Sequence, residues 1–313
     1  MKKIDFHIHT CRNTPLEQLV KSIESMIEEN GYCGVCVLSV FYNSEDLNTD
    51  GSVKNNATAL EIKKAIPGSY AFAALNHFDG KPYEEQIDDI ISQGFDGIKM
   101  LIGKPNRIKM CGFSFTDPRF DAFFEKMEKL QMPIVSHSGD PDISYDITKA
   151  TPRMIEKGWV YDDTYATKEE CHQQVEALMA KYPNLKIALA HMGFFADELD
   201  RLSVLMDKYP NLYMDITPAL PIYKDLSQDP EKSREFFIKY QDRIYYGTDA
   251  EIELVGERLA YNRKKVKIIT AFLEGKDTVQ IEDYTINPIN LPEDVLEKIY
   301  YKNILNFCGK PKQ

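Results

Sequence analysis

Two histidines, His7 and His9, flank Ile8 at the end of the apolar run KIDFHIHT near the start of the chain. Such a run predicts a buried strand, and side chains two residues apart lie on the same face of a strand. Both imidazoles can therefore reach one point. Imidazole nitrogen is a common ligand of divalent metals, so the pair is a candidate part of a metal site, although a single H-x-H is weak evidence.

Three further residues of suitable chemistry end later apolar runs. His137 ends PIVSH, His191 ends KIALAH and Asp249 ends RIYYGTD. Each has an ordinary alternative, because a histidine at a strand end is commonly a hydrogen-bonded core or rim residue and an aspartate there can cap the next helix. One metal site explains all five residues together. Nitrogen and carboxylate ligands suit Zn²⁺, with Fe²⁺, Mn²⁺ or Co²⁺ as other occupants.

These residues can meet only if the strands that carry them lie side by side. Strand-like runs alternate with helical patterns, which predicts parallel strands joined by helical crossovers. Eight such units make a (β/α)₈ TIM barrel, in which the carboxyl ends of all strands converge on one mouth. An open doubly wound sheet is the alternative. The strand-like runs cover residues 3–10, 33–40, 70–75, 97–102, 133–137, 186–191, 212–217 and 243–249.

Helical periodicity fills the intervals between these runs. The first helix has the clearest signals, because Thr14, Pro15 and Glu17 predict a capping box with proline at the first helical position, and Gly31 ends the helix. The helix near 55–66 has the weakest pattern. The other predicted helices cover residues 82–93, 117–131, 168–182, 196–208, 230–241, 256–274 and 292–307.

The whole chain, 1–313, is expected to form one barrel domain, since it contains no linker, repeat or low-complexity segment. Two long segments, 41–54 and 138–166, follow strand ends and are expected to cover the mouth. A net charge of −11 without a long basic cluster argues against nucleic acid and anionic membranes as partners. With no membrane-length apolar run and no evident signal peptide, we expect a cytoplasmic protein with a small-molecule substrate. A homo-oligomer is compatible with the sequence.

The segments DFHIHT, IKM, DPRFDAFFEKMEKLQMPIVSHSG, IALAHMG and YYGTDA resemble, in this order and spacing, the amidohydrolase superfamily. More narrowly, they look like its amidohydrolase-related (amidohydrolase 2) branch. The resemblance covers nearly the whole chain, including the tail VLEKIYYKNILNFCG. It implies a (β/α)₈ barrel that holds a divalent metal. This branch includes metal-dependent hydrolases, lactonases and decarboxylases of the aminocarboxymuconate-semialdehyde type.

The resemblance also implies roles for the candidate residues. Asp249 matches a metal ligand that takes a proton from water in hydrolytic members. His191 matches a histidine that binds a second metal in some members and polarises the substrate in others. By motif, the implied ligands of the metal are His7, His9, His137 and Asp249.

Lys99 lies in GIKMLIGKP, where relatives often have GIKLHP. It is either a carboxylated ligand that bridges two metals, a lysine at the barrel rim, or an ammonium that binds a substrate carboxylate; we favour one metal and a free ammonium. Arg12 could anchor an anionic substrate, although surface placement is favoured, and His77 could line the mouth. Asp140 could support the site or be solvated, and His172 is expected on the surface.

The expected activity is metal-dependent hydrolysis of an ester, lactone or amide bond in a small substrate. The run KPNRIKM adds positive charge near the mouth and favours an anionic substrate. Two alternatives remain. One is a metal-dependent, non-oxidative decarboxylase of an unsaturated or aromatic carboxylic acid, which would use the same ligands. The other is a barrel that binds a metabolite without catalysis.

Overall fold

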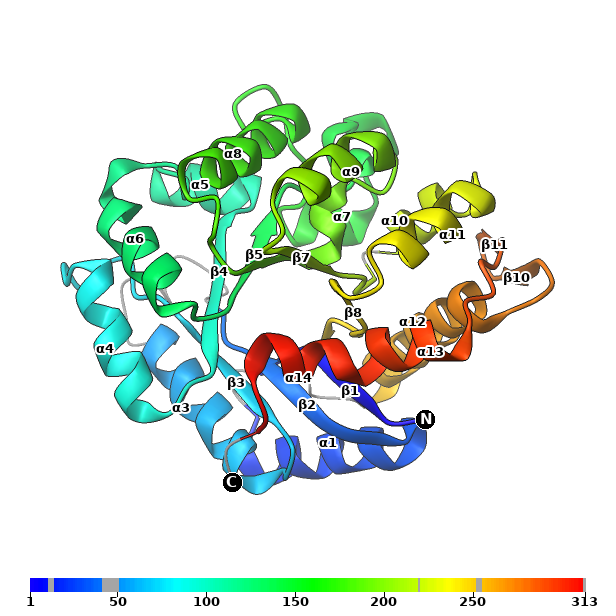
Figure 1. The fold of residues 1–313 in the computed structure, drawn as a ribbon, viewed down its shortest axis with the longest axis horizontal. Coiled ribbons are helices and arrows are strands. Elements are labelled where there is room, and N and C mark those ends of the chain that lie inside the picture. The colour runs from blue at the N-terminus through cyan, green and yellow to red at the C-terminus, as the bar shows by residue number, and fades with distance from the viewer. Residues whose placement is uncertain (11–13, 41–50, 219, 252–254, 312–313) are drawn as a thin grey trace.

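The computed structural model describes residues 1–10, 14–40, 51–218, 220–251 and 255–311. Its central feature is one curled sheet of parallel strands with helices on its outer face (Figure 1). Neighbouring strands follow one another in chain order from the first to the eighth. The strands are β1 (Lys3–His9), β2 (Tyr32–Leu38), β3 (Tyr70–Ala74), β4 (Gly97–Gly103), β5 (Ile134–Ser138), β6 (Ile187–Leu189), β7 (Leu212–Asp215), β8 (Ile244–Tyr245) and β9 (Ala250–Glu251).

The predicted eighth strand, 243–249, contains β8 alone, and β9 follows directly after it; the two together close the barrel. β8 pairs with β7, while β9 pairs with β1, where Ile8 lies opposite Ala250. Between these pairings, the Phe6 N–H donates to the Tyr246 carbonyl over 3.0 Å. This segment therefore joins the last strand to the first. The predicted (β/α)₈ barrel is confirmed, and the open doubly wound sheet is excluded.

Helices follow the strands and cover the outer face of the barrel (Figure 1). All the predicted helices are present, but α5, α7, α10 and the hairpin of β10 (Val279–Ile281) and β11 (Tyr284–Ile286) were not expected. The helices are α1 (Leu16–Asn30), α3 (Gly51–Ala65), α4 (Tyr83–Gln93), α5 (Pro105–Cys111), α6 (Asp121–Leu130), α7 (Pro152–Glu156), α8 (Lys168–Lys181), α9 (Leu199–Lys208), α10 (Pro221–Leu226), α11 (Pro230–Lys239), α12 (Gly256–Glu274), α13 (Glu293–Glu297) and α14 (Asn303–Cys308).

The start of α1 differs from the prediction. Pro15 has ψ of 140°, so it lies outside the helix as its N-cap, and no side chain caps the first turn. The capping box predicted from Thr14 is therefore wrong. Glu17 instead pairs with Lys21 over 2.7 Å. The predicted end is confirmed, because Gly31 has φ of 66° and its N–H donates to the last turn.

The end of the barrel away from the mouth is filled by aromatic rings. Phe6, Tyr245 and Phe307 belong to one buried cluster inside the strands. The ring centroids of Phe6 and Tyr245 are 4.7 Å apart, and those of Tyr245 and Phe307 are 5.1 Å apart. The helix α14 thus closes this end of the barrel. The polar residues inside the barrel lie at its other end, at the carboxyl ends of the strands.

Of the two long segments expected at the mouth, the structure describes 138–166 in full and only the end of 41–54. The segment 138–166 carries the short helices η2 (Asp142–Tyr145), η3 (Ile147–Lys149) and α7. Most of the segment 41–54 lies outside the described residues, and α3 begins at Gly51. That the chain forms a single domain, and that these segments cover the mouth, stay predictions. Among the described residues, no helix is long and apolar enough to cross a membrane.

Candidate active site

An irregularity in β1 turns both histidines of the H-x-H toward the inside of the barrel. Pairing with β2 shifts register between Asp5 and Ile8. Phe6 packs in the inner cluster, whereas Ile8 packs in the outer one, beneath the helices. A strand that keeps strict alternation would place Phe6 and Ile8 on the same face. Before the register shift Phe6 points into the barrel, and after it His7 and His9 do. Bulges near active sites commonly redirect side chains in this way.

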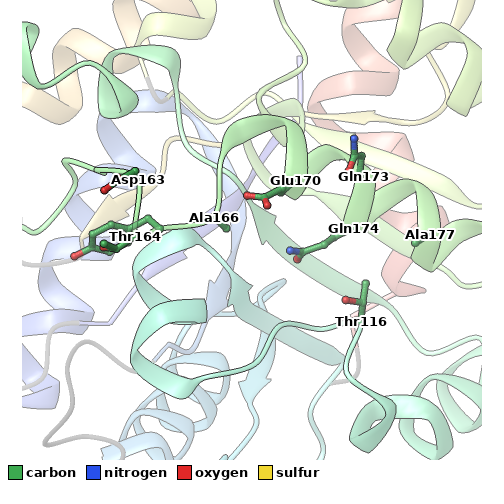
Figure 2. Close-up of a pocket in the computed structure, with 9 residues that line it drawn as sticks. Thr116, Asp163, Thr164, Ala166, Glu170, Gln173, Gln174 and Ala177 are labelled. Atoms are coloured by element: carbon green, nitrogen blue, oxygen red, sulfur yellow. The ribbon is translucent and has the colours of Figure 1, made fainter.

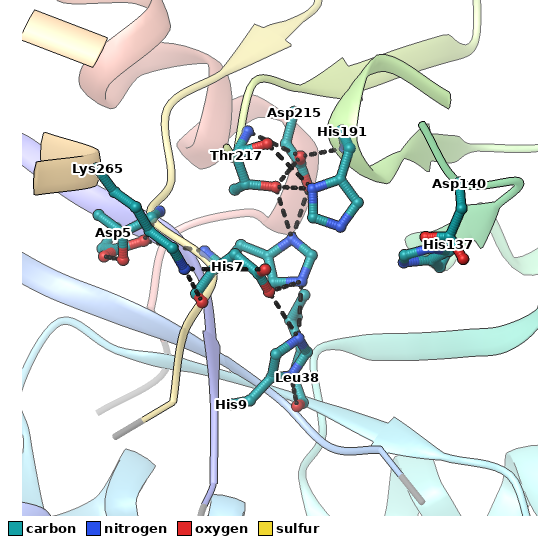
Figure 3. Close-up of polar contacts among 12 residues, drawn as sticks. Asp5, His7, His9, Leu38, His137, Asp140, His191, Asp215, Thr217 and Lys265 are labelled. Atoms are coloured by element: carbon teal, nitrogen blue, oxygen red, sulfur yellow. Dashed lines mark hydrogen bonds and ion pairs between the residues drawn. The ribbon is translucent and has the colours of Figure 1, made fainter. Parts of the chain in front are cut away.

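His7, His9 and Asp249 form a compact group of possible metal ligands. The two Nε2 atoms are 3.0 Å apart. The Oδ1 atom of Asp249 lies 3.2 Å from Nε2 of His9 and 3.6 Å from Nε2 of His7. One ligand atom from each residue falls within 4.8 Å of the others. Figure 3 shows the Nε2 atoms of the two rings pointing toward each other at the end of β1.

Hydrogen bonds at Nδ1 fix which nitrogen carries the proton in each of these two rings. Nδ1 of His7 is 2.8 Å from a carboxylate oxygen of Asp215, and Nδ1 of His9 is 2.8 Å from the Leu38 carbonyl oxygen. Both partners can only accept, so both Nδ1 atoms carry the proton and both Nε2 atoms present a lone pair. Burial lowers the pKa of His7 to about 3, which keeps that ring neutral. Two lone pairs and a carboxylate therefore converge without a proton between them, an arrangement that fits a divalent cation.

Asp249 reaches this group from a sharp turn between β8 and β9. Its φ is 53°, a left-handed conformation that non-glycine residues rarely adopt. Nζ of Lys265, on α12, donates to the Asp249 carbonyl over 2.7 Å and lies 4.0 Å from its carboxylate. Burial would raise the pKa of Asp249, but Lys265 and His9 hold it well below its ordinary value. The turn also needs Gly247, because an added Cβ would lie 2.5 Å from Thr217 and 3.0 Å from the backbone of His7.

His191 lies in a strained turn directly after β6. Its φ of 55° is followed by φ values of 56°, 60° and 59° at Met192, Gly193 and Phe194. A left-handed residue other than glycine costs roughly 1–2 kcal/mol, so three of them among four successive left-handed residues indicate a functional constraint. The predicted strand 186–191 thus ends at Leu189, and His191 lies two residues beyond its carboxyl end; its role in the site stays a prediction.

The proton of His191 is also fixed. Its Nδ1 lies 3.0 Å from the Thr217 carbonyl oxygen and 2.8 Å from the Thr217 hydroxyl, whose own proton goes to Asp215. Nδ1 must therefore donate, and the neutral ring offers a lone pair at Nε2. Burial lowers the pKa of His191. In this tautomer Nε2 can bind a metal or accept a proton, but it donates to a substrate carbonyl only after protonation.

Asp215, at the end of β7, was missed by the sequence analysis. One of its carboxylate oxygens accepts from Nδ1 of His7, and the other accepts from the His191 N–H over 2.7 Å and from the Thr217 N–H and hydroxyl. Its side chain is fully buried. Burial would raise the pKa of Asp215, but His7 holds it below the ordinary value. The available signal was its position, since Asp215 is the polar residue that ends the seventh strand.

His137 lies on the far side of His191 from His7 (Figure 3). Its ring centroid is 4.9 Å from that of His191. Its Nε2 lies 3.0 Å from the Gly139 carbonyl oxygen and 3.4 Å from Asp140, so this nitrogen donates. Asp140 also accepts from Lys104 over 2.6 Å and from the Tyr161 hydroxyl. Asp140 is thus a buried support of His137, whose role as a metal ligand stays a prediction.

Lys99 stands on β4 with its side chain inside the protein. It is 2% exposed, and its ammonium has no hydrogen-bond partner within the described part of the chain. Burial lowers the pKa of Lys99 to about 8, although Asp215 and Asp249 act in the opposite direction. An unpaired buried cation normally has a partner in a functional complex. The arrangement therefore fits either an anionic ligand or a modified side chain.

The remaining candidates lie elsewhere. Nδ1 of His77 is 2.9 Å from the Tyr83 hydroxyl, and His77 lines a hollow of about 320 Å³ beside Arg119. Its role in substrate binding stays a prediction. Arg12 lies outside the described residues. His172 was expected on the surface, and this is wrong, because it is fully buried on the inner side of α8.

A larger hollow, of about 520 Å³, does not contain the candidate ligands (Figure 2). It lies beside α8, and its walls are part polar and part apolar. We do not assign the active site to it, because the convergent ligand atoms lie inside the barrel. Its lining residues are Thr116, Asp163, Thr164, Tyr165, Ala166, Glu170, Gln173, Gln174 and Ala177.

The sequence pattern of the amidohydrolase family matches residues 34–307. The match begins after β1, so the geometry of His7 and His9 is separate evidence. No curated protein matches the chain.

Three solved structures align with nearly the full length. An amidohydrolase II structure has a TM-score of 0.65 and 14% identity, covering 98% of this chain and 100% of that one. 4-Oxalomesaconate hydratase from Rhodopseudomonas palustris has a TM-score of 0.61 and 13% identity, covering 98% and 95%. A dihydroxybenzoic acid decarboxylase from Polaromonas, with bound manganese and the inhibitor 2-nitroresorcinol, has a TM-score of 0.58 and 16% identity, covering 98% and 96%. At these identities the likeness establishes the fold.

Proposed function

The chain belongs to the amidohydrolase family, and we propose that it is a metal-dependent hydrolase that cleaves an ester, lactone or amide bond in a small anionic substrate. The observation that carries this proposal is the convergence of His7, His9 and Asp249. Their ligand atoms lie within 4.8 Å of one another, and the protons of both rings are held on the opposite side.

His7, His9 and Asp249 would hold the metal, with His137 as the proposed fourth ligand. When bound, a divalent cation supplies Lewis acidity, which makes water a nucleophile near neutral pH and polarises a carbonyl. Zn²⁺ suits these ligands, and Mn²⁺, Fe²⁺ or Co²⁺ would also fit. The manganese in the related decarboxylase supports a divalent ion without fixing its identity.

The residues around the ligands would move protons and orient the substrate. Asp249 is ionised, so its carboxylate can accept a proton from the attacking water and return it to the leaving group. Nε2 of His191, in the turn after β6, offers a second acceptor. The ammonium of Lys99 would bind an anionic group of the substrate, which would supply the partner that it lacks among the described residues. In this assignment Lys99 is unmodified and one metal is bound.

Decarboxylation is the second candidate, because the same ligands could orient a carboxylic acid. The structural likeness to a dihydroxybenzoic acid decarboxylase supports it. Hydrolysis is favoured by the ionised Asp249 within the ligand group, since a general base at the metal suits the activation of water. A barrel that only binds a metabolite is the third candidate, and the convergence of His7, His9 and Asp249 argues against it.

The test has two parts. Elemental analysis should find a divalent metal in the purified protein and its loss when His7 and His9 are both replaced by Ala. The matched control is His77→Ala, which should keep its metal. The metal-loaded protein is then given esters, lactones and amides of small carboxylic acids, and CO₂ release from aromatic acids is measured in parallel. Full metal content in the double variant, or CO₂ release without hydrolysis, would refute the proposal.

A further inference from the structure

We propose that His172, on the inner side of α8, is a positioning residue that holds the left-handed turn carrying His191 in its active geometry. The inference rests on the proposed function in one respect, namely that His191 acts in the site. Its other premises are contacts of His172 itself. His172 comes from α8, which directly precedes β6, and it lies 21 residues before the turn's Gly193.

The turn cannot hold its shape through local preference. Residues 191–194 all have φ values between 55° and 60°, and only one of the four is glycine. Backbone in this region persists only where surrounding groups fix it. At the start of the turn, Asp215 accepts the His191 N–H over 2.7 Å. A second restraint is needed at the other end, where the chain leaves the turn.

His172 supplies that restraint through two contacts. Its Nε2 lies 3.1 Å from the Gly193 carbonyl oxygen, which can only accept, so Nε2–H donates. Its ring stacks on Phe195 with centroids 3.6 Å apart and planes 14° apart. The ring is fully buried, and Glu198 lies 3.4 Å from its Nδ1. The residue therefore fixes the carbonyl two positions after His191 and the side chain that follows the turn.

The turn around Gly193 is tightly packed, so small shifts of its neighbours would move its backbone. A Cβ added at Gly193 would lie 3.0 Å from a methyl of Leu189 and 3.1 Å from the ring of Phe195. The turn is thus confined between β6 and the ring that His172 stacks on. A shift of Phe195 or of the Gly193 carbonyl would rotate the backbone that carries His191. The ring of His191 would then move relative to His7, whose centroid is 5.4 Å away.

The test compares two variants of His172. His172→Phe keeps the aromatic stack and removes the donor, whereas His172→Gln keeps a donor at the position of Nε2. Tyr240→Phe is the matched control, because it removes a donor to the Ser203 carbonyl between outer helices. The first readout is the ¹⁵N–¹H spectrum of imidazole-labelled protein, which has six histidines. The His191 signal is assigned by its loss in His191→Gln.

In His172→Phe we expect the His191 Nδ1–H signal to shift or disappear while those of His7 and His9 and the metal content stay unchanged. In His172→Gln and Tyr240→Phe the His191 signal should stay in place. On any substrate found for the enzyme, His172→Phe should lower kcat by about 10- to 100-fold, with KM nearly unchanged and with rescue by Gln.

An unchanged His191 signal in folded His172→Phe would overturn the inference. So would an equal change in Tyr240→Phe, since that would be a general effect of lost stability. If His172→Phe does not fold, His172→Leu, which also lacks the donor, takes its place: a shifted or lost His191 signal supports the inference, and an unchanged one overturns it. The spectrum needs no substrate, so failure of the proposed hydrolase activity is distinguishable from failure of this inference.

Discussion

Asp215 determines which nitrogen of His7 can bind a metal. Because its carboxylate accepts the Nδ1 proton of His7, the Nε2 lone pair faces His9 and Asp249. In Asp215→Asn, an amide cannot accept all the donors that now meet at this carboxylate. His7 is then free to carry its proton on Nε2, where it blocks the ligand group. Changes to such supporting carboxylates typically weaken metal affinity by about 10- to 100-fold.

We therefore expect Asp215→Asn to weaken metal binding by that amount, measured by competition with a chelator of known affinity. Asp207→Asn is the matched control, because Asp207 pairs with Lys239 on the outer surface. Equal affinity of the wild type and Asp215→Asn would show that Asp215 does not orient His7.

Lys99 should lower the stability of the protein near neutral pH. Its pKa in the folded state is about 8, against an ordinary value of 10.5. Because the folded-state pKa is the lower one, the unfolded chain binds more protons between these values, and stability rises with pH across this window. The difference corresponds to about 3 kcal/mol. Lys99→Met should therefore unfold at higher urea concentration than the wild type at pH 7, and the gap should narrow by pH 10.5. A gap that is constant with pH would contradict the prediction.

The same variant separates one metal from two. If Lys99 is an ammonium that binds the substrate, Lys99→Met should raise KM and leave the metal content at its wild-type value. A wild type with two metals per chain, one of which is lost in Lys99→Met, would instead support a carboxylated lysine. An ammonium about 4 Å from a cation costs about 4 kcal/mol at an effective dielectric of 20, so an unmodified lysine cannot be a ligand.

The strands and their carboxyl-end residues could be predicted because apolar runs and alternation are local features of the sequence. The division of the eighth strand at Asp249 and the turn at His191 could not, since non-glycine residues with positive φ are imposed by tertiary contacts such as Lys265 and Asp215. The register shift in β1 has the same origin. The helix α5 was missed although its sequence carries a local signal, Pro105 at the first position.

The geometry of the turn after β6 predicts that Gly193→Ala destabilises the protein. Gly193→Ala adds a Cβ at φ of 60°, 3.0 Å from Leu189. Gly112→Ala is the control, because Gly112 has φ of 75° and nothing within 4 Å of an added Cβ. The control should lose about 1 kcal/mol of unfolding free energy from conformation alone, and Gly193→Ala should lose about 2 kcal/mol or more. Urea unfolding measures both, and equal losses would show that the turn can move to accept the methyl group.

The molecule as a whole carries a charge opposite to that of the proposed substrate pocket. Its net charge is −11, yet it buries three lysines: Lys99 on β4, Lys104 between β4 and α5, and Lys265 on α12. Lys104 is neutralised by Asp140, and Lys265 is occupied by the Asp249 carbonyl. Lys99 is the one of these three without a partner among the described residues. An anionic substrate is thus repelled at long range and attracted at contact.

Because the repulsion acts at long range and the attraction to Lys99 acts at contact, salt should change kcat/KM for an anionic substrate. Salt screens the long-range repulsion, since the Debye length falls from about 30 Å at 0.01 M to about 8 Å at 0.15 M, while the contact with buried Lys99 is screened much less. For an anionic substrate, kcat/KM should therefore rise with ionic strength over this range, by a factor of a few. A neutral analogue with the same scissile bond should show no change, which controls for effects of salt on the protein. A steep fall of kcat/KM with salt would mean that a basic rim steers the substrate, and the repulsion inferred from the net charge would be wrong.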